Sequence, residues 1–257
     1  MIRYLRLVAN ASNWWLHFAV KLGLTSEDPL LFKTRNRIQI EVPRRLHHEF
    51  KEIFMEASYT IGLAAKVPKA PTIVDIGANV GFFSLFAASR FPGASIFAYE
   101  PVPRNFDQLV RNRELNQKAK ITCVPKAVYG FSGLVNLEID PADTFTTSAR
   151  VAAVPTQASS TIEVPCTALS DLLDAHGIEA CHLLKIDCEG AEFDILYSCP
   201  EAYLQRIEQM VIEVHRGATP ERTIEHLSRF LESRCFSTRR SHNMLWVWNA
   251  GTSQYRH

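Results

Sequence analysis

The chain is expected to fold as an α/β domain with a twisted, mostly parallel sheet that helices cover on both faces. Three observations predict this fold. From residue 71 onwards, short apolar runs alternate with helix-forming segments, the pattern of chains that build parallel sheets. One run, Thr72–Ile76, passes directly into a glycine-bearing turn and a helix. Two others are followed at once by Glu100 and Asp187, which puts carboxylates where parallel strands end.

Residues 1–70 are expected to form a helical and irregular cap on a domain that spans residues 71–257. The chain begins with basic Arg3 and Arg6, followed by the apolar segment Leu7–Val20, which polar residues interrupt. This segment has no clear signal-peptide cleavage site and is too short and too polar to span a bilayer. We interpret it as a helix packed on the domain or on a second subunit, consistent with a homodimer. Since tryptophans accompany the basic residues, contact with a membrane surface is the alternative.

The remaining elements follow from apolar periodicity and from proline and glycine breaks. In the cap, residues Arg37–Val42 should form a strand and Phe50–Ala65 a helix. The core strands are expected at Thr72–Ile76, Ser95–Tyr99, Ile121–Val124, Leu183–Ile186 and Met210–Val214. Helices are expected at Phe82–Arg90, Arg104–Asn116, Ala168–Ala175 and Ala191–Tyr197, and a last strand, Leu245–Trp248, should pair with Phe236–Arg239.

One segment interrupts the alternation of strands and helices. Val135–Ile139 and Thr161–Val164 are strand-like, and residues 140–160 between them are rich in Thr, Ser, Ala and Pro. Such a segment cannot bury a core of its own. Because long loops of compact domains are often functional, a lid over a binding site is one interpretation, and a flexible hairpin tip is the other.

Composition excludes some classes of protein. With 257 residues, 47% of them hydrophobic and 21% charged, the chain suits one large domain with a small appendage. A formal net charge of +1 argues against a nucleic-acid binder that depends on a basic surface. The 6 cysteines contain no CxxC pair and no zinc-binding spacing. We therefore expect reduced thiols in a cytoplasmic protein.

The turn after the first core strand predicts a nucleotide-type cofactor. Gly77 and Gly81 let the backbone turn sharply beside a ligand, and the next helix directs its N-terminal amides there. A dinucleotide site requires a second glycine where Asn79 stands. Asp75, at the strand end, would repel a phosphate and favour a cationic ligand. Glu100, after the next strand, lies at the right distance along the chain to accept hydrogen bonds from ribose hydroxyls.

A ligand with a ribose, a positive charge and no phosphate is S-adenosylmethionine, and we expect it here. Two competing hypotheses remain: a nicotinamide-dependent oxidoreductase and a non-catalytic module with the same fold. A tight turn without a ligand, followed by a solvated Glu100, is the corresponding structural alternative. Asn79 and Asp75 argue against the nicotinamide site, because neither suits a pyrophosphate.

A second dense motif follows the fourth core strand. Lys185, Asp187, Glu189 and Glu192 crowd around one strand end, where Gly190 turns the chain into a helix. Ligands of open parallel sheets lie beyond the carboxyl ends of the strands, so Asp187 should share an edge with Asp75 and Glu100. His215 should reach the same edge, on the same face of its strand as Glu213.

These motifs resemble the FkbM-type methyltransferases. The matching runs are Val74–Gly81, Tyr99–Pro101 with Asn105, Leu115-Asn116, Lys185–Glu192 and Ile212–His215, and they span roughly residues 70–240. The resemblance implies a class I methyltransferase (Rossmann-like) fold, S-adenosylmethionine as methyl donor, and transfer to a hydroxyl of a small molecule such as a sugar or natural product. The adenine ring would lie near Ala127 in this fold, and Asn79 would contact the methionine end.

Methyl transfer to an alcohol needs a group that takes the hydroxyl proton. His215 is the first candidate for this base because its unperturbed pKa lies near 6.5. Asp187 is the second, as a base, as a group that orients the acceptor or as a metal ligand. Lys185 could steady the carboxylates or the acceptor oxygen. A divalent Mg or Mn ion held by Asp187, Glu213 and His215 is a less favoured alternative, and we expect no metal.

Overall fold

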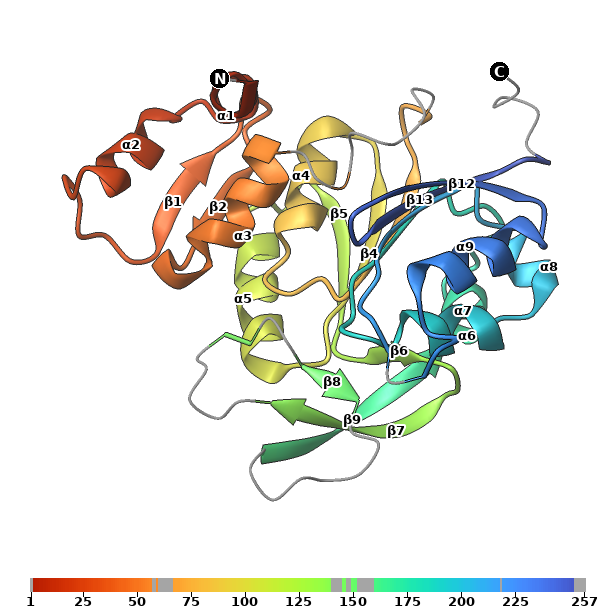
Figure 1. Cartoon of the computed structure of the whole chain (residues 1–257). Helices are drawn as coiled ribbons and strands as arrows, with labels where there is room; N and C mark the ends of the chain where they lie inside the picture. Colours follow the sequence, from red (N-terminus) through yellow and green to blue (C-terminus); the bar gives the residue numbers. More distant parts are fainter. Residues whose placement is uncertain are drawn as a thin grey trace.

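The computed structural model describes residues 2–56, 59, 67–139, 145–146, 149–151, 160–217 and 219–251. Within these ranges, the chain forms a seven-stranded sheet with helices on both faces (Figure 1). The spatial order is β12 (Phe236–Ser241), β13 (Met244–Asn249), β11 (Gln209–Glu213), β10 (Leu183–Ile186), β3 (Thr72–Ile76), β4 (Ser95–Tyr99) and β5 (Lys120–Val124). The five strands from β11 to β5 are parallel, and β13 is antiparallel to both neighbours. The predicted mostly parallel sheet is confirmed.

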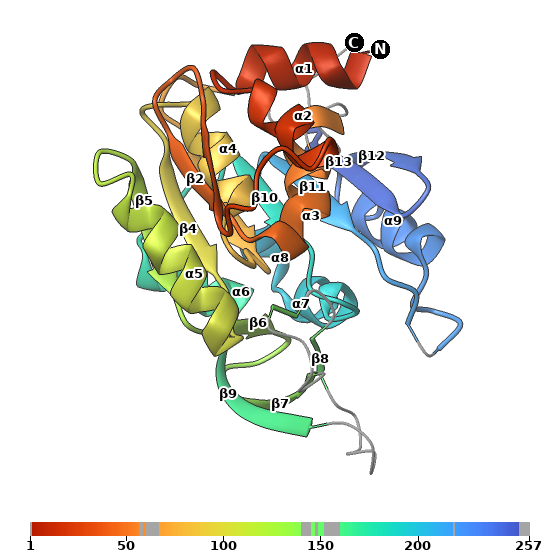
Figure 2. The same cartoon turned by 90° about the vertical axis from the view of Figure 1, so that its left-hand side faces the viewer.

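Alternating side chains of these strands enter two separate hydrophobic clusters, one on each face of the sheet. On one face, Ile73 and its neighbours pack under α4 (Phe82–Arg90) and α5 (Pro103–Glu114). On the other face, Val74 and its neighbours pack against four helices: α6 (Leu169–Ala175), α7 (Glu192–Ser198), α8 (Glu201–Leu204) and α9 (Ile224–Glu232). Successive residues of a strand point to opposite faces, so both faces of this sheet need an apolar cover. Figure 2 shows these helices from the side.

The strand register places polar residues among the apolar ones on the α4 face. Lys185 of β10 lies beside Asp75 of β3 and beside Val211 of β11. Two residues beyond Val211, and therefore on the same face, stands Glu213. Three adjacent strands thus bring ionisable side chains together near their carboxyl ends, where the candidate site lies.

The cap contains more regular structure than the sequence predicts. It comprises α1 (Ile2–Asn10), α2 (Trp15–Lys21), a hairpin of β1 (Leu30–Lys33) and β2 (Gln39–Val42), a short 3-10 helix (Arg44–Leu46), α3 (His47–Lys51) and a π-helical turn (Glu52–Glu56). The apolar N-terminal segment forms two helices, not one. The helix expected at residues 50–65 begins earlier, at His47, and residues 57–58 and 60–66 lie outside the described residues. No helix in the described part of the chain has both the length and the apolarity to cross a bilayer.

A four-stranded sheet extends from the end of β5 and contains β6 (Ala127–Tyr129), β9 (Ser160–Ala168), β7 (Gly133–Ile139) and β8 (Arg150–Val151). The strands expected at 135–139 and 161–164 lie within β7 and β9, which pair antiparallel. Most of the proposed lid, residues 140–160, lies outside the described residues, but 145–146 and 149–151 are described. Other elements without a sequence prediction are β1, the 3-10 helix at Arg44–Leu46, β6, β8, α8 and α9.

Candidate functional site

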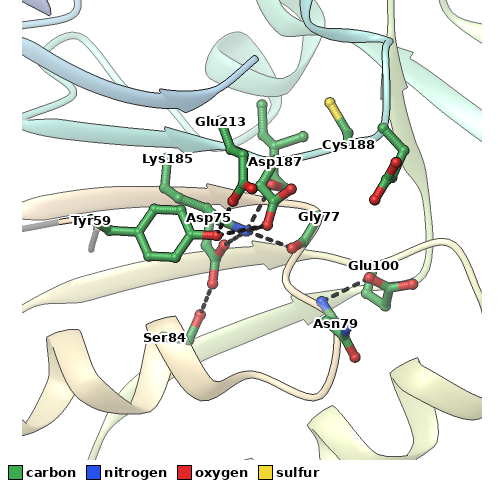
Figure 3. Close-up of polar contacts among 12 residues, drawn as sticks. Tyr59, Asp75, Gly77, Asn79, Ser84, Glu100, Lys185, Asp187, Cys188 and Glu213 are labelled. Atoms are coloured by element: carbon green, nitrogen blue, oxygen red, sulfur yellow. Dashed lines mark hydrogen bonds and ion pairs between the residues drawn. The ribbon is translucent and has the colours of Figure 1, made fainter. Parts of the chain in front are cut away.

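Asp75 is fully buried and is held by the protein itself. Its Oδ2 accepts a hydrogen bond from the Ser84 hydroxyl at 2.7 Å, and Lys185 Nζ lies 3.4 Å from its Oδ1 (Figure 3). Ser84 lies in α4, so this contact fixes the helix to the strand end. The side chain of Asp75 does not line the neighbouring pockets of the described structure. Direct contact between Asp75 and a cofactor therefore stays a prediction, and its observed contacts are those of a supporting group.

Lys185 connects the two sequence motifs. Its ammonium donates a hydrogen bond to the Gly77 carbonyl at 2.6 Å and lies 3.5 Å from Asp187 Oδ2. Burial opposes the charge on this lysine, but the nearby Asp187 and Asp75 carboxylates outweigh it and raise its pKa. Lys185 is therefore a fixed cation at neutral pH, which holds the glycine turn and both carboxylates in place.

The glycine turn adopts the left-handed backbone that its sequence suggests. Gly77 has φ of +70°, Asn79 +51° and Gly81 +87°. The amides of Gly77 and Ala78 both donate to the Tyr99 carbonyl, at 3.1 and 2.9 Å. A Cβ on Gly77 would lie 1.8 Å from the Asp187 carbonyl oxygen, so the two motifs touch through backbone. Gly81 precedes α4, and a Cβ there would lie 2.5 Å from the side chain of the buried Leu109.

Glu100 projects from the end of β4 toward this turn. Its carboxylate accepts hydrogen bonds from the amide of Asn79 at 2.8 Å and from that of Val102 at 2.9 Å. Only 4% of the residue is exposed. Burial raises the pKa of Glu100 to about 7, although the two backbone hydrogen bonds oppose that shift. This carboxyl group consequently titrates near neutral pH.

A first pocket opens above Glu100. Seven residues were predicted from the sequence to bind the cofactor. Five of them line this pocket, namely Gly77, Asn79, Glu100, Asn105 and Ala127, together with Asp187, whereas Asp75 and Gly81 do not line it. The buried oxygens Asn79 Oδ1 and Asn105 Oδ1 have no hydrogen-bond partner among the residues that the structure describes. Buried polar atoms are normally paired, so these two oxygens fit a ligand that donates hydrogen bonds.

The segment 140–160 contributes to this first pocket through its described residues. Thr146, Ala149 and Val151 line it, and the side-chain amide of Asn105 donates to the Thr146 carbonyl at 2.8 Å. Arg150 lies 3.5 Å from Glu189, which belongs to the opposite wall. These contacts agree with a covering role for the segment, which stays a prediction.

A second pocket lies on the cap side of the glycine turn. Its wall includes Glu49 and Glu52 from the cap together with Tyr59, Lys185 and Glu213. It shares four residues with the first pocket: Gly77, Asn79, Asp187 and Glu189. The two pockets therefore meet along one rim, and Asp187 stands on it.

Tyr59 lines the second pocket and was not singled out from the sequence. Its hydroxyl lies 2.9 Å from Asp187 Oδ2 and 2.7 Å from Glu213 Oε2 (Figure 3). Burial, and then the two carboxylates, raise its pKa well above the usual 10, so the phenol keeps its proton. A phenol has one hydrogen to donate, and it therefore satisfies only one of these carboxylates at a time. No sequence motif surrounds Tyr59, so the contact could not be foreseen.

His215 reaches the predicted edge but is held by carboxylates. Its Nδ1 lies 2.8 Å from Glu192 Oε1, and its Nε2 lies 3.6 Å from Glu189 Oε1. Burial disfavours the charged ring, but the Glu192 hydrogen bond and the nearby Glu192, Glu189 and Asp187 charges raise the pKa of His215 to about 9. The imidazole is therefore protonated at neutral pH. The role of His215 as the base stays a prediction, and the raised pKa argues against it.

The described residues contain no cluster of three or more His, Cys, Asp or Glu side chains suited to a metal ion. Two of the three residues considered as Mg or Mn ligands are engaged in hydrogen bonds within the protein. His215 is hydrogen-bonded to Glu192, and the Glu213 carboxylate accepts hydrogen bonds from Tyr59 and Asn243. All six cysteines, each in the described part of the chain, are unpaired.

The fold, the glycine turn and the acidic strand ends define a class I methyltransferase architecture, and comparison with known proteins identifies the family. Residues 75–238 match the methyltransferase FkbM domain. This protein therefore belongs to the FkbM family of S-adenosylmethionine-dependent methyltransferases. The family membership removes the nicotinamide-dependent oxidoreductase from consideration.

Individual relatives support this assignment. The chain is 30% identical to methyltransferase sdnD of Sordaria araneosa, over 64% of this chain and 73% of the relative. It is 31% identical to 31-O-demethyl-FK506 methyltransferase FkbM of Streptomyces tacrolimicus, over 65% of this chain and 73% of that protein. A solved FkbM methyltransferase from Methylobacillus flagellatus superposes with a TM-score of 0.52 at 15% identity, over 96% of this chain and 58% of that one. That likeness shows the shared fold.

The pKa of Glu100 leads to a testable pH dependence of cofactor binding. If Glu100 binds the ribose as predicted, a ribose hydroxyl would donate to its carboxylate form, which disappears as the pH falls through about 7. Affinity for S-adenosylhomocysteine should therefore weaken between about pH 8 and pH 6, approaching tenfold per pH unit below the pKa. Glu100→Gln should lose about 1.5–3 kcal/mol of binding energy at the higher pH and bind with little pH dependence. Calorimetric titration measures both, with Asp107→Asn, an exposed carboxyl on α5, as the matched control. Equal pH dependence in wild type and Glu100→Gln would contradict the assignment.

Proposed function

We propose that this enzyme transfers the methyl group of S-adenosylmethionine to a hydroxyl of a small molecule such as a sugar or natural product. The observation that carries the proposal is the common rim of the two pockets, formed by Gly77, Asn79, Asp187 and Glu189. A donor in the first pocket and an acceptor in the second would meet at this rim. Alignment of the two reactants is the main requirement of such a reaction, because the sulfonium methyl is already activated.

The first pocket has the groups that this cofactor requires. Glu100 can accept hydrogen bonds from the ribose hydroxyls, and the unpaired oxygens of Asn79 and Asn105 can accept them from amino groups. Ala127 and Val102 offer apolar surface to the adenine. When bound, S-adenosylmethionine supplies the electrophilic methyl carbon, and its positive charge suits a pocket with Glu100, Asp187 and Glu189 in its wall.

Asp187 is the base that we assign. Its side chain is 27% exposed and stands on the common rim, whereas the raised pKa of His215 leaves that ring with no free site for a proton at neutral pH. An acceptor hydroxyl would donate its hydrogen bond to Asp187, and its proton would pass to this carboxylate as the carbon–oxygen bond forms and the carbon–sulfur bond breaks. Lys185 and Tyr59 would keep the carboxylate in position.

The two parts of the chain line different pockets. We propose that residues 71–257 hold the cofactor and that the cap, residues 1–70, shapes the acceptor pocket through Glu49 and Glu52. The acceptor class rests on relatives: one acts on 31-O-demethyl-FK506 by name. Another is the hexuronic acid methyltransferase AglP of Haloferax volcanii, 29% identical over 60% of each chain.

The decisive experiment compares three variants in labelled-methyl transfer to a panel of hydroxyl compounds. Asp187→Asn should lower turnover about a hundredfold or more while the affinity for S-adenosylhomocysteine holds. Glu213→Gln, which alters the wall of the second pocket but not the common rim, should change the KM for the acceptor more than it changes turnover. His215→Gln should retain turnover at neutral pH.

Two outcomes would contradict this assignment. Full activity of Asp187→Asn would remove Asp187 from the role of base, and loss of turnover confined to His215→Gln would restore the histidine to it. Failure of wild-type enzyme to methylate any hydroxyl compound, with transfer to amine or thiol analogues, would change the acceptor class.

A further inference from the structure

Large apolar side chains are exposed mainly in one part of the molecule. Of the eleven that the described residues expose, six fall within residues 2–24: Ile2, Leu5, Trp14, Trp15, Leu22 and Leu24. Leu22 and Leu24 are 70% and 75% exposed, and Trp15 is 58% exposed. Scattered apolar residues need no explanation, but a concentration of this kind marks an interaction surface.

Ile2, Leu5 and Trp15 lie on α1 and α2, and the other three flank α2; the two helices form one unit at an edge of the molecule. The rings of Tyr4 in α1 and Phe18 in α2 lie 5.6 Å apart, and Trp14 packs edge-on against Phe18 at 6.0 Å. Figures 1 and 2 show both helices on the opposite side of the molecule from β7 and β9. The apolar surface is therefore presented outward by a fixed pair of helices.

The same unit carries only positive formal charge. Residues 1–26 contain Arg3, Arg6 and Lys21, and the first acidic residue is Glu27. Beside them, a pocket between α1, α2 and α3 is lined by three cations, Arg3, Lys21 and Lys51, and one carboxylate, Glu56, together with His17 and His47, so its formal charge is positive. Burial, followed by the charges of Lys51, Lys21 and Arg3, lowers the pKa of His17. Burial, followed by the charges of His17, Lys51 and Arg44, lowers the pKa of His47 to about 4. An anionic group would find complementary charge at this pocket.

We propose that α1 and α2 dock this enzyme on the surface of an anionic lipid bilayer. The exposed leucines and tryptophans would enter the interfacial region, and Arg3, Lys21 and Lys51 would face lipid phosphates. Tryptophan and basic residues on short helices suit this environment. A second copy of the chain is the less favoured occupant, because a two-fold contact places a patch against itself and would oppose these cations to one another.

Co-sedimentation of the full chain with vesicles tests the proposal. Wild type should pellet with vesicles of phosphatidylcholine plus phosphatidylserine and remain in solution with phosphatidylcholine alone. The pairs Trp15→Ser/Leu24→Ser and Arg3→Gln/Lys21→Gln should each lower the partition coefficient about tenfold or more. Matched pairs elsewhere, Phe131→Ser/Leu134→Ser and Lys118→Gln/Lys120→Gln, should bind as wild type does. Thermal unfolding verifies that each variant is folded.

The proposal is overturned if wild type ignores the phosphatidylserine vesicles, or if the patch variants and the matched controls bind equally. Light scattering during size-exclusion chromatography addresses the rival occupant. A dimer that Trp15→Ser/Leu24→Ser converts to a monomer, in a protein that does not bind vesicles, would assign the surface to a second copy.

Discussion

Gly77→Ala should abolish cofactor binding and destabilise the fold by about 4 kcal/mol or more. The new Cβ would lie 1.8 Å from the Asp187 carbonyl oxygen and 2.9 Å from its carbon. Both atoms belong to backbone, so no side-chain rotation relieves the clash, and the two motifs must separate. The left-handed φ of +70° adds a smaller cost for any residue with a Cβ. Denaturant unfolding and calorimetric titration with S-adenosylhomocysteine measure the two effects.

Gly177→Ala is the matched control for this prediction. Gly177 also has a left-handed φ, +60°, but a Cβ there would meet nothing within 4 Å. Its substitution should cost only about 1–2 kcal/mol of backbone strain and leave cofactor affinity intact. If the two variants lose equal stability, the close approach of Gly77 to the Asp187 backbone is not what constrains this position.

Lys185→Met should destabilise the protein by about 3–5 kcal/mol, because it leaves the fully buried Asp75 carboxylate without its counter-charge. It also removes the 2.6 Å hydrogen bond to the Gly77 carbonyl, so the glycine turn should loosen and cofactor affinity should fall. Chemical denaturation and calorimetric titration report these losses separately.

The double variant Asp75→Asn/Lys185→Met distinguishes charge from packing. Neutralising both partners removes the unpaired buried charge, and the amide oxygen introduced in place of the carboxylate can still accept the Ser84 hydrogen bond. We expect the double variant to be more stable than Lys185→Met alone, with coupling of about 1–3 kcal/mol. Additive losses would show that the buried ion pair does not govern stability here.

The sequence predicted the parts of the site that depend on local pattern. Gly77, Glu100 and Asp187 each follow an apolar strand, and parallel strands bring their carboxyl ends to one edge, so their proximity follows from fold class alone. The register that sets Lys185 beside Asp75 could not be read from either motif. Because of this register, Asp75 pairs with Lys185 and does not line either pocket.

Residues whose state depends on long-range packing could not be predicted. Tyr59 meets Asp187 only because the cap docks over the sheet, across a sequence separation of 128 residues. The pKa of His215 depends on its hydrogen bond to Glu192, the first residue of α7. In the cap, the apolar segment read as one helix is divided because Ala11 pairs with Thr34 of the hairpin, an interaction that periodicity does not reveal.

A crystal structure with S-adenosylhomocysteine tests the account most directly. The ribose hydroxyls should contact Glu100, and the sulfur should face the rim shared by Gly77, Asn79 and Asp187, with the second pocket open beyond it. A ligand bound elsewhere, or a sulfur atom directed away from Asp187, would contradict the assignment of donor and acceptor pockets.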